Sequence, residues 1–461
     1  MKKVFISHAH QDDAFARQLA EGLKSVGIEV WVDEFALRVG DNLIEKINEG
    51  LSKCDHLIVI MSKAYFESSW TRHEFSAFAA REMAGKSNPI LPVLIEDCDI
   101  PVFLRDRVYL DFRTSFEEPF QRMVSFFTGE KEPPTTTTEL AHIAQNQSDS
   151  ALSYQVSRLR EHLQRGEMTL FCGAGISLGA GVPAWSNLLS DLLAGMFGKQ
   201  LPKVKQDLAE LYQSHFSPSP LIMAQYLKNG LGDDFLTYVR TSLYKEKPTT
   251  SSLIDAVVEL CRPQRSRASL NSIVTFNFDD LLEHNLQENH IHYHSVFAEG
   301  QRPKRSEIPI YHVHGYLPRS GDLTEDNDIV FSEDAYHSQF IDSFSWSNLV
   351  QLNHLSQNVC VFVGLSMTDP NLRRLLDVAM RKTPDRKANH YVFRKKCDRK
   401  RVGDVLSPKT GHSKRAADIA DFARIVELLE DQDSRNLGLN VIWVDEYTDI
   451  PKILRRIAEE I

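Results

Sequence analysis

Short apolar segments and amphipathic helical segments alternate along the first 127 residues. Runs of strand length occupy residues 3–6, 29–32, 56–61 and 90–95. Between Asp12 and Val26 the apolar positions recur at helical spacing, and residues 43–51 and 69–83 show similar spacing. Short strands that alternate with helices are typical of a parallel sheet covered on both faces. We therefore predict an α/β domain over residues 1–127.

A second α/β segment follows residue 150. Its strand-like apolar runs occupy residues 168–172, 272–276, 310–313, 359–363, 390–393 and 440–444. Helical patterns cover residues 152–165 and 450–461, and the stretch from about 187 to 245 is mainly helical. This order predicts a second parallel sheet, with a helical insertion after its first strand, over residues 151–461.

The two segments are joined by a stretch of different composition. Residues 128–150 contain Pro133-Pro134 and four consecutive threonines, with few apolar residues. Such a stretch is a poor basis for a core and is typical of a linker. We place the domain boundary within it.

The overall composition is that of a globular protein. The chain has 461 residues, 42% of them apolar, and its 53 basic and 63 acidic residues give a net charge of −10. An acidic chain is a poor candidate for a nucleic-acid surface, which needs clustered basic residues. The apolar runs are far shorter than the roughly 20 residues of a membrane span, and the N-terminus lacks the apolar stretch of a secretion signal. We expect a cytoplasmic protein with no membrane partner.

Neither the cysteines nor the histidines indicate a metal site. The six cysteines are widely separated and form no CxxC pair, which is the spacing of many zinc sites. His290, His292 and His294 alternate and would share one face of an extended strand. No carboxylate or cysteine pattern accompanies them, so we expect no metal.

A glycine-rich turn follows the strand at residues 168–172. It contains Gly173, Ala174, Gly175 and Ser177. Glycines after a parallel strand let the backbone approach a pyrophosphate, next to the amide donors of a helix N-terminus. The spacing GxGxxxGxG departs from the usual GxGxxG, and an ordinary tight turn is the alternative.

Polar residues follow three more of the predicted strands. Asn277 and Asp279 follow the strand at 272–276, and His314 follows the strand at 310–313. Gly364 and Ser366, with Asp369, follow the strand at 359–363. Ligands of open parallel sheets bind beyond the carboxyl ends of the strands, so these residues predict a nucleotide site.

Together these motifs resemble the sirtuin superfamily over roughly residues 151–461. The pattern GAGxSxxxG[IV]P is met in full by Gly173, Ala174, Gly175, Ser177, Gly181, Val182 and Pro183. TxNxDxL is met by Thr275, Asn277, Asp279 and Leu281, and HG by His314-Gly315. The resemblance implies a Rossmann-like domain that uses NAD as its substrate. The sequence GLSMTD at 364–369 is similar to that of prokaryotic sirtuin-like defence proteins.

The resemblance also implies roles for individual residues. Residues 173–177 would cradle the NAD pyrophosphate, with Pro183 and Trp185 in the same NAD-binding set, and Gly364 and Ser366 would line the adenosine side. Asn277 would hold a water or the ribose near the reacting carbon, and Asp279 would orient the loop or a ribose hydroxyl. His314 would act as a general base, because the pKa of an unperturbed imidazole lies near working pH.

One departure from the family concerns its zinc module. Sirtuin deacylases carry paired CxxC motifs on a small domain that helps to form the acyl-lysine channel, whereas this chain has a helical insertion in that region. With water as the acceptor in place of an acyl-lysine, the resemblance implies a NAD glycohydrolase that releases ADP-ribose and nicotinamide.

Residues 1–127 resemble a TIR domain of the bacterial type, which implies a flavodoxin-like parallel sheet. The resemblance rests on the order of Val4–His8, Asp12-Asp13, Trp31–Asp33 and Ser68–Glu74. In enzymatic TIR domains a glutamate at the position of Glu74 meets the nicotinamide ribose, where a carboxylate stabilises an oxocarbenium-like transition state. The alternative is that Glu74 lies on a solvated helix face. The loop at residues 33–42 would shape the pocket and mediate assembly.

The leading hypothesis is an antiviral NAD glycohydrolase of the abortive-infection type that self-associates through its TIR domain and responds to a phage-derived trigger. A second hypothesis assigns a cyclic ADP-ribose product to the TIR domain through Glu74, while the sirtuin-like domain depletes NAD. In a third, the TIR domain serves only in oligomerisation or sensing.

Overall fold

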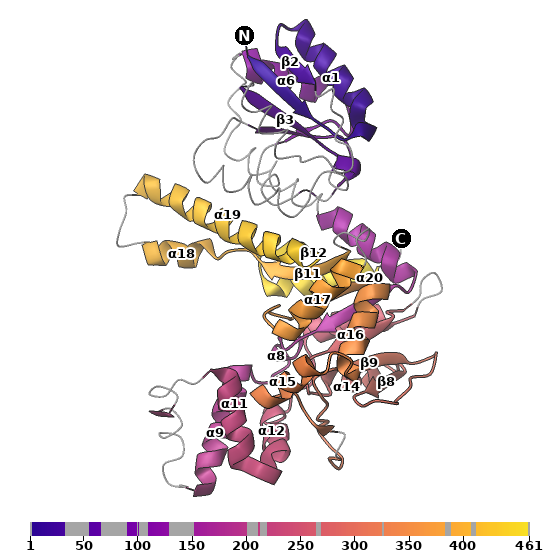
Figure 1. The fold of residues 1–461 in the computed structure, drawn as a ribbon, viewed down its shortest axis with the longest axis vertical. Helices are drawn as coiled ribbons and strands as arrows, with labels where there is room; N and C mark the ends of the chain where they lie inside the picture. Colours follow the sequence, from indigo (N-terminus) through magenta and orange to yellow (C-terminus); the bar gives the residue numbers. More distant parts are fainter. Residues whose placement is uncertain are drawn as a thin grey trace. The chain divides into compact units, whose positions relative to one another are not determined.

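The computed structural model describes residues 2–32, 55–65, 90–98, 100, 109–128, 152–200, 211–212, 219–263, 269–324, 327–382, 389–406 and 412–459. The chain forms two compact units. One comprises residues 1–157 with 397–436, and the other comprises residues 158–396 with 437–461. Each unit contains one sheet with its helices, as Figure 1 shows.

The first unit is built on a five-stranded parallel sheet. Its elements are β1 (Lys3–Ser7), α1 (Asp13–Ser25), β2 (Glu29–Val32), β3 (His56–Met61), β4 (Ile90–Leu94), β5 (Leu110–Asp111) and α6 (Glu117–Thr128). The strand order is β2-β1-β3-β4-β5, with every pair parallel. This order is flavodoxin-like, so the predicted fold of the N-terminal part is confirmed.

Apolar spacing explains why these segments pack as they do. All six residues of β3 are buried, as expected of a central strand covered on both faces. Leu19 and Leu23 recur at helical spacing on α1 and join one core cluster with Ile58 of β3 and Met123 of α6. The predicted helices at 43–51 and 69–83, the loop at 33–42 and Glu74 lie outside the described residues, as do all residues of the predicted linker except Thr128.

Two helices far along the chain belong to the first unit. They are α18 (Arg399–Leu406) and α19 (His412–Asn436), and Figure 1 shows them side by side. The backbone N–H of Cys397, before α18, donates to the Glu427 carboxylate of α19 at 3.0 Å. The sequence patterns did not predict this pair of helices.

The second unit is built on a seven-stranded parallel sheet. Its strands are β6 (Met168–Cys172), β7 (Ser272–Thr275), β8 (Tyr293–Val296), β9 (Ile308–His312), β10 (Val359–Val363), β11 (His390–Lys395) and β12 (Leu439–Val444). Its helices are α8 (Gly175–Leu178), α9 (Trp185–Gln200), α11 (Pro220–Leu231), α12 (Phe235–Leu243), α13 (Ser252–Cys261), α14 (Leu281–Glu288), α15 (Glu333–Ile341), α16 (Trp346–Gln357), α17 (Pro370–Lys382) and α20 (Ile450–Ala458).

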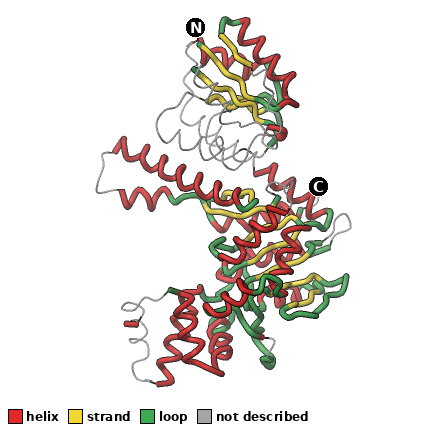
Figure 2. The backbone as a smooth tube through the Cα atoms, viewed as in Figure 1, coloured by secondary structure: helices red, strands yellow, loops and turns green. Residues whose placement is uncertain are grey.

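The strand order β12-β11-β10-β6-β7-β9-β8 explains where a ligand would bind. Without the edge strand β8, it is the Rossmann order, and it reverses between β6 and β10. Both of these central strands are buried along their whole length, and the rings of Phe171 and Phe362 meet across them at 4.8 Å. Figure 2 shows helices flanking the strands. The prediction of a second parallel α/β sheet is confirmed.

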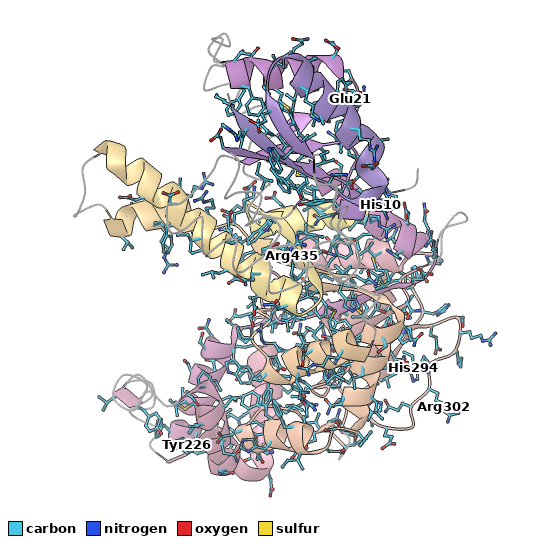
Figure 3. All side chains as sticks on the ribbon, turned by 45° about the horizontal axis from the view of Figure 1, so that its top comes forward. His10, Glu21, Tyr226, His294, Arg302 and Arg435 are labelled. Atoms are coloured by element: carbon cyan, nitrogen blue, oxygen red, sulfur yellow. The ribbon has the colours of Figure 1, made fainter. Side chains whose placement is uncertain are left out.

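Between β6 and β7 the chain leaves the sheet and forms helices α9, α11 and α12. These helices lie side by side in Figure 1, in the region where the sequence pattern is mainly helical. Pro220 begins α11, and the Ser219 side chain accepts the Ile222 N–H at its N-terminus. Tyr226 of α11 is half exposed, at the surface of this group (Figure 3).

The three alternating histidines do not share one strand. His290 lies before β8 with φ at 56°, whereas His294 lies within β8, 3.7 Å from the Glu307 carboxylate (Figure 3). Among the described residues, no group of three or more histidine, cysteine or acidic side chains is placed to hold a metal ion. The helices in the described ranges include no candidate for a membrane span.

The packing of β6 against β10 gives a stability prediction. We expect Phe171→Ala to destabilise the second unit by about 3–5 kcal/mol, because it removes a fully buried ring and leaves a cavity. Phe344→Ala is the matched control, since that ring is 80% exposed. Thermal melting followed by circular dichroism measures both, and equal melting temperatures for the two variants would contradict this account of the core.

Candidate functional site

Two backbone turns meet where the strand order reverses. The turn after β6 begins at Gly173, and the turn after β10 begins at Gly364. The Gly173 N–H donates to the Val363 carbonyl, and the Gly175 N–H donates to the Gly364 carbonyl, each at 3.0 Å. The structure therefore brings together two glycine motifs that lie almost 190 residues apart in the sequence.

Only glycine fits this crossing. A Cβ on Gly175 would lie 2.6 Å from the Gly364 Cα, and a Cβ on Gly364 would lie 2.7 Å from the Ile176 nitrogen. Gly364 also has φ at +69°, a conformation that side chains disfavour. The amides of Gly173, Gly175, Ile176 and Ser177 all donate to backbone carbonyls, so they stabilise the turn itself and leave little room for more than a close backbone approach by a ligand.

Asn277 is fixed against the first of these turns. Its side-chain nitrogen donates to the Gly173 carbonyl at 3.1 Å and to the Ser177 hydroxyl at 3.0 Å. Its backbone N–H donates to the Thr275 hydroxyl at 3.1 Å. Because both amide hydrogens are used, the Asn277 side chain offers its carbonyl oxygen to a ligand.

Asp279 lies buried next to the same serine. The Ser177 hydroxyl donates to its carboxylate, and the Leu281 N–H donates to it at 3.2 Å. Burial raises the pKa of Asp279 to about 6, and the hydrogen bond from Ser177 opposes this shift. Asn277, Ser177 and Asp279 thus form one connected group, as the motif order led us to expect of neighbouring strand ends.

His314 lies two residues beyond the end of β9 and is 5% exposed. Its ring meets Phe276 edge to face at 4.7 Å and Tyr336 at 5.5 Å. Burial lowers the pKa of His314, and the Asp369 carboxylate opposes this shift. No described residue is a hydrogen-bond partner of its buried Nε2 atom. The imidazole is therefore neutral and can accept a proton, but its lowered pKa makes it a weaker base than the unperturbed ring expected from the sequence.

Sequence reasoning missed Tyr336. This partly buried tyrosine of α15 forms a hydrogen bond with Asp369, and the Asp369 Oδ1 atom accepts the Leu372 N–H at 2.7 Å. Burial and the Asp369 charge raise the pKa of Tyr336. No motif surrounds Tyr336 in the sequence, so only the packing of α15 reveals its place beside His314.

Sequence reasoning also missed the link between the helical insertion and the polar loops. The Tyr244 hydroxyl, just after α12, accepts the Asp280 N–H at 2.9 Å and donates to the Leu317 carbonyl at 2.8 Å. Arg319 closes the link, because its backbone N–H and its Nε each donate to the Asp280 carboxylate. The loops after β7 and β9 are therefore tied to the end of the insertion.

The other residues of the predicted NAD-binding set are Trp185, Ser366 and Pro183. The Trp185 ring packs on Phe331 at 4.5 Å, and Phe331 lies beside Phe278 of the Asn277 loop. The Ser366 hydroxyl pairs with Thr368 at 2.7 Å, two residues beyond Gly364. Pro183 lies in the loop that leads into α9 and is partly buried. Their contacts with NAD stay predictions.

In the first unit, polar residues also gather after the strands. The Ser62 hydroxyl donates to the Asp12 carboxylate, and the Lys63 N–H donates to the Glu96 carboxylate at 2.7 Å. Burial raises the pKa of Asp12. These groups follow β1, β3 and β4, at the edge where a parallel sheet binds ligands. Glu74 itself is outside the described residues.

Curated relatives match a short part of this chain. An NAD(+) hydrolase, TcpA, from Theionarchaea archaeon (strain DG-70-1) is 50% identical over 91 residues, which is 20% of this chain and 27% of that protein. The 2' cyclic ADP-D-ribose synthase BtTIR of Bacteroides thetaiotaomicron is 48% identical over 90 residues, 19% of this chain and 31% of its own length. The NAD(+) hydrolase PdTIR of Paracoccus denitrificans (strain Pd 1222) is 41% identical over 91 residues, 20% of this chain and 30% of its own length. The matched segment therefore covers less than a third of each of these relatives.

Two family models match the chain, one in each half. A TIR domain matches residues 4–124, and a SIR2-like domain matches residues 271–407. The second match includes Asn277, Asp279, His314 and Gly364, and the glycine-rich turn at 173–177 precedes it. The chain thus combines a TIR domain and a SIR2-like domain.

Proposed function

We propose that this protein is an NAD glycohydrolase whose SIR2-like domain converts NAD and water to ADP-ribose and nicotinamide. The observation that carries the proposal is the hydrogen-bonded group of Asn277, Ser177 and Asp279, together with a buried His314 whose ring packs on Phe276, the residue before Asn277. Relatives of the TIR domain named as NAD(+) hydrolases support the same substrate. The absence of any CxxC pair from the sequence supports water, rather than an acyl-lysine, as the acceptor.

The residues would divide the reaction between them. The bond between nicotinamide and the ribose carbon breaks, its electrons leave with the neutral nicotinamide, and positive charge develops on the ribose. The Asn277 carbonyl oxygen, whose amide nitrogen is already bonded, would hold the attacking water or a ribose hydroxyl. As the water oxygen bonds to the ribose carbon, His314 would accept its proton. Asp279 would position Ser177 and, through it, the Asn277 side chain.

We further propose that the chain acts in cytoplasmic antiviral defence, as the resemblance to prokaryotic sirtuin-like defence proteins implies. Depletion of NAD in an infected cell would stop phage production along with the host's own metabolism. The TIR domain would self-associate in response to a phage-derived trigger and so control the SIR2-like domain.

A second candidate function has its own support. One relative is named a 2' cyclic ADP-D-ribose synthase, and it is nearly as similar to the chain as the first NAD(+) hydrolase. The TIR domain would then make a cyclic ADP-ribose product through Glu74, while the SIR2-like domain depletes NAD. In the simpler alternative, the TIR domain only senses the trigger or oligomerises.

The proposed base and its neighbour can be tested directly. We expect Asn277→Ala and His314→Ala each to lower nicotinamide release by about 100-fold or more, because each removes a group that acts on the attacking water. The assay follows nicotinamide release from NAD by the purified full-length chain. His294→Ala is the matched control, since His294 lies on the edge strand β8 and contacts Glu307 instead. Unchanged turnover in both site variants would refute the assignment.

The buried carboxyl of Asp279 predicts a pH-dependent stability difference. Its pKa is about 6 in the folded chain and lies near the ordinary value of 3.8 in the unfolded chain, so folding binds a proton between these values. The stability that the protonated carboxyl contributes is present below about pH 4 and is lost as the pH rises through about 6. We expect Asp279→Asn to melt at a higher temperature than the wild type at pH 7.5, with a smaller difference at pH 5. The exposed Asp322→Asn is the control, and a shift in melting temperature that is the same at both pH values would contradict the burial argument.

The role of the TIR domain can be separated from that of the SIR2-like domain in cells. We expect His314→Ala to preserve NAD during phage infection, whereas Glu74→Ala should remove any cyclic ADP-ribose product and leave hydrolysis by the SIR2-like domain in place. Mass spectrometry of extracts measures NAD, ADP-ribose and the cyclic products together. An unchanged product profile in Glu74→Ala would leave assembly as the function of the TIR domain.

A further inference from the structure

A buried histidine–glutamate pair lies next to the Asn277 loop. His312 is the last residue of β9, and Glu283 lies in the first turn of α14. The His312 Nε2 atom is 2.6 Å from the Glu283 Oε1 atom, and the two side chains are 0% and 4% exposed. A buried ionisable pair stabilises a fold only weakly, because both groups lose their hydration. Stability alone therefore does not explain why this pair is buried here.

The second ring nitrogen of His312 points to that reason. Its Nδ1 atom is 3.1 Å from the backbone carbonyl oxygen of Asn277. A carbonyl only accepts hydrogen bonds, so Nδ1 must carry a hydrogen. Nδ1 thus holds the main chain of the residue whose side chain we place beside the ribose.

Glu283 fixes the ring in this orientation. Its Oε1 atom also accepts the Ser295 hydroxyl at 2.9 Å, so the same atom contacts both His312 and Ser295. The two ring nitrogens of His312 thus contact the Glu283 carboxyl and the Asn277 carbonyl. The Tyr316 ring packs on the His312 ring at 4.3 Å.

We propose that His312, oriented by Glu283, is a positioning residue for Asn277. It holds the Asn277 carbonyl while Gly173 and Ser177 hold the side chain, so the residue is fixed at both ends. A peptide held in this way cannot rotate and carry the side-chain oxygen away from the ribose. The inference rests on the proposed hydrolysis of NAD in the SIR2-like domain.

A second histidine–glutamate pair in the same unit shows what a merely structural contact looks like. His294 of β8 lies 3.7 Å from Glu307, which comes just before β9, and their side chains are 38% and 18% exposed. Glu307 also accepts the Lys304 N–H in its own loop. The His312–Glu283 pair is shorter and more deeply buried, and it reaches a residue of the candidate site.

Two substitutions at His312 separate its two hydrogen bonds. The Nδ2 atom of asparagine occupies the place of the histidine Nδ1, so His312→Asn keeps a donor for the Asn277 carbonyl and loses Glu283. The Nε2 atom of glutamine occupies the place of the histidine Nε2, so His312→Gln keeps Glu283 and loses the Asn277 carbonyl. We expect His312→Gln to lower kcat about 10- to 100-fold, with KM for NAD and the melting temperature close to those of the wild type. His312→Asn should retain most of the kcat of its folded fraction.

The outcomes are decisive for the full-length protein in the nicotinamide-release assay. A wild-type kcat in His312→Gln would overturn the positioning role. The role would also be overturned if His312→Gln and His312→Asn lost the same fraction of kcat and the same number of degrees in melting temperature. If His312→Asn does not fold, His312→Gln still tests the role. A lower kcat with unchanged KM and melting temperature supports it, and any other result contradicts it. Asn277→Ala tests the proposed function independently. If that variant is inactive while His312→Gln is fully active, only the positioning role fails. If Asn277→Ala and His314→Ala are both fully active, the proposed function itself fails.

Discussion

The candidate site depends on a close contact between two turns of the backbone. Gly173 and Gly175 meet Gly364 at the point where the strand order reverses, and their hydrogen bonds join β6 to β10 beyond the last sheet pairing. A side chain at this crossing would force the turns apart. Asn277 donates to the carbonyl of Gly173, so its position depends on the same contact. The glycines, which lack a Cβ atom, therefore determine the geometry of the site as much as polar residues such as Asn277 do.

Burial shifts the pKa values of the two ionisable groups proposed for the site, Asp279 and His314. Both Asp279 and His314 lie where water is excluded, and burial shifts each toward its neutral form: the pKa of the acid rises and that of the imidazole falls. An acid and a base with such shifts are typical of reactive sites in proteins. His312 differs from His314, because both of its ring nitrogens have hydrogen-bond partners, the Glu283 carboxyl and the Asn277 carbonyl. Neighbouring histidines on one segment thus have opposite environments.

The sequence predicted the parts of the molecule that depend on local patterns. Apolar runs located the central strands β3, β6 and β10, and the motifs that follow the strands led to Asn277, Asp279 and His314 as neighbours. Contacts made by residues without a local motif could not be predicted. Tyr336 reaches Asp369 only because α15 packs against α17, which Asp369 precedes, and Tyr244 reaches Asp280 only because α12 ends there. His312 stands two positions before the HG motif, yet its role depends on Glu283, whose pairing no spacing in the sequence reveals.

The hydroxyl of Tyr244 also determines whether the helical insertion can be removed from the SIR2-like domain without changing the site. An insertion that leaves a sheet after one strand and returns before the next looks like a cassette that could be exchanged or shortened. Here its closing residue satisfies a backbone donor at Asp280 and a backbone acceptor at Leu317, both in loops of the site. Removal of the cassette would leave these groups without partners. A chimaera built by cutting before Tyr244 would therefore change the site itself, and a workable junction lies beyond that residue.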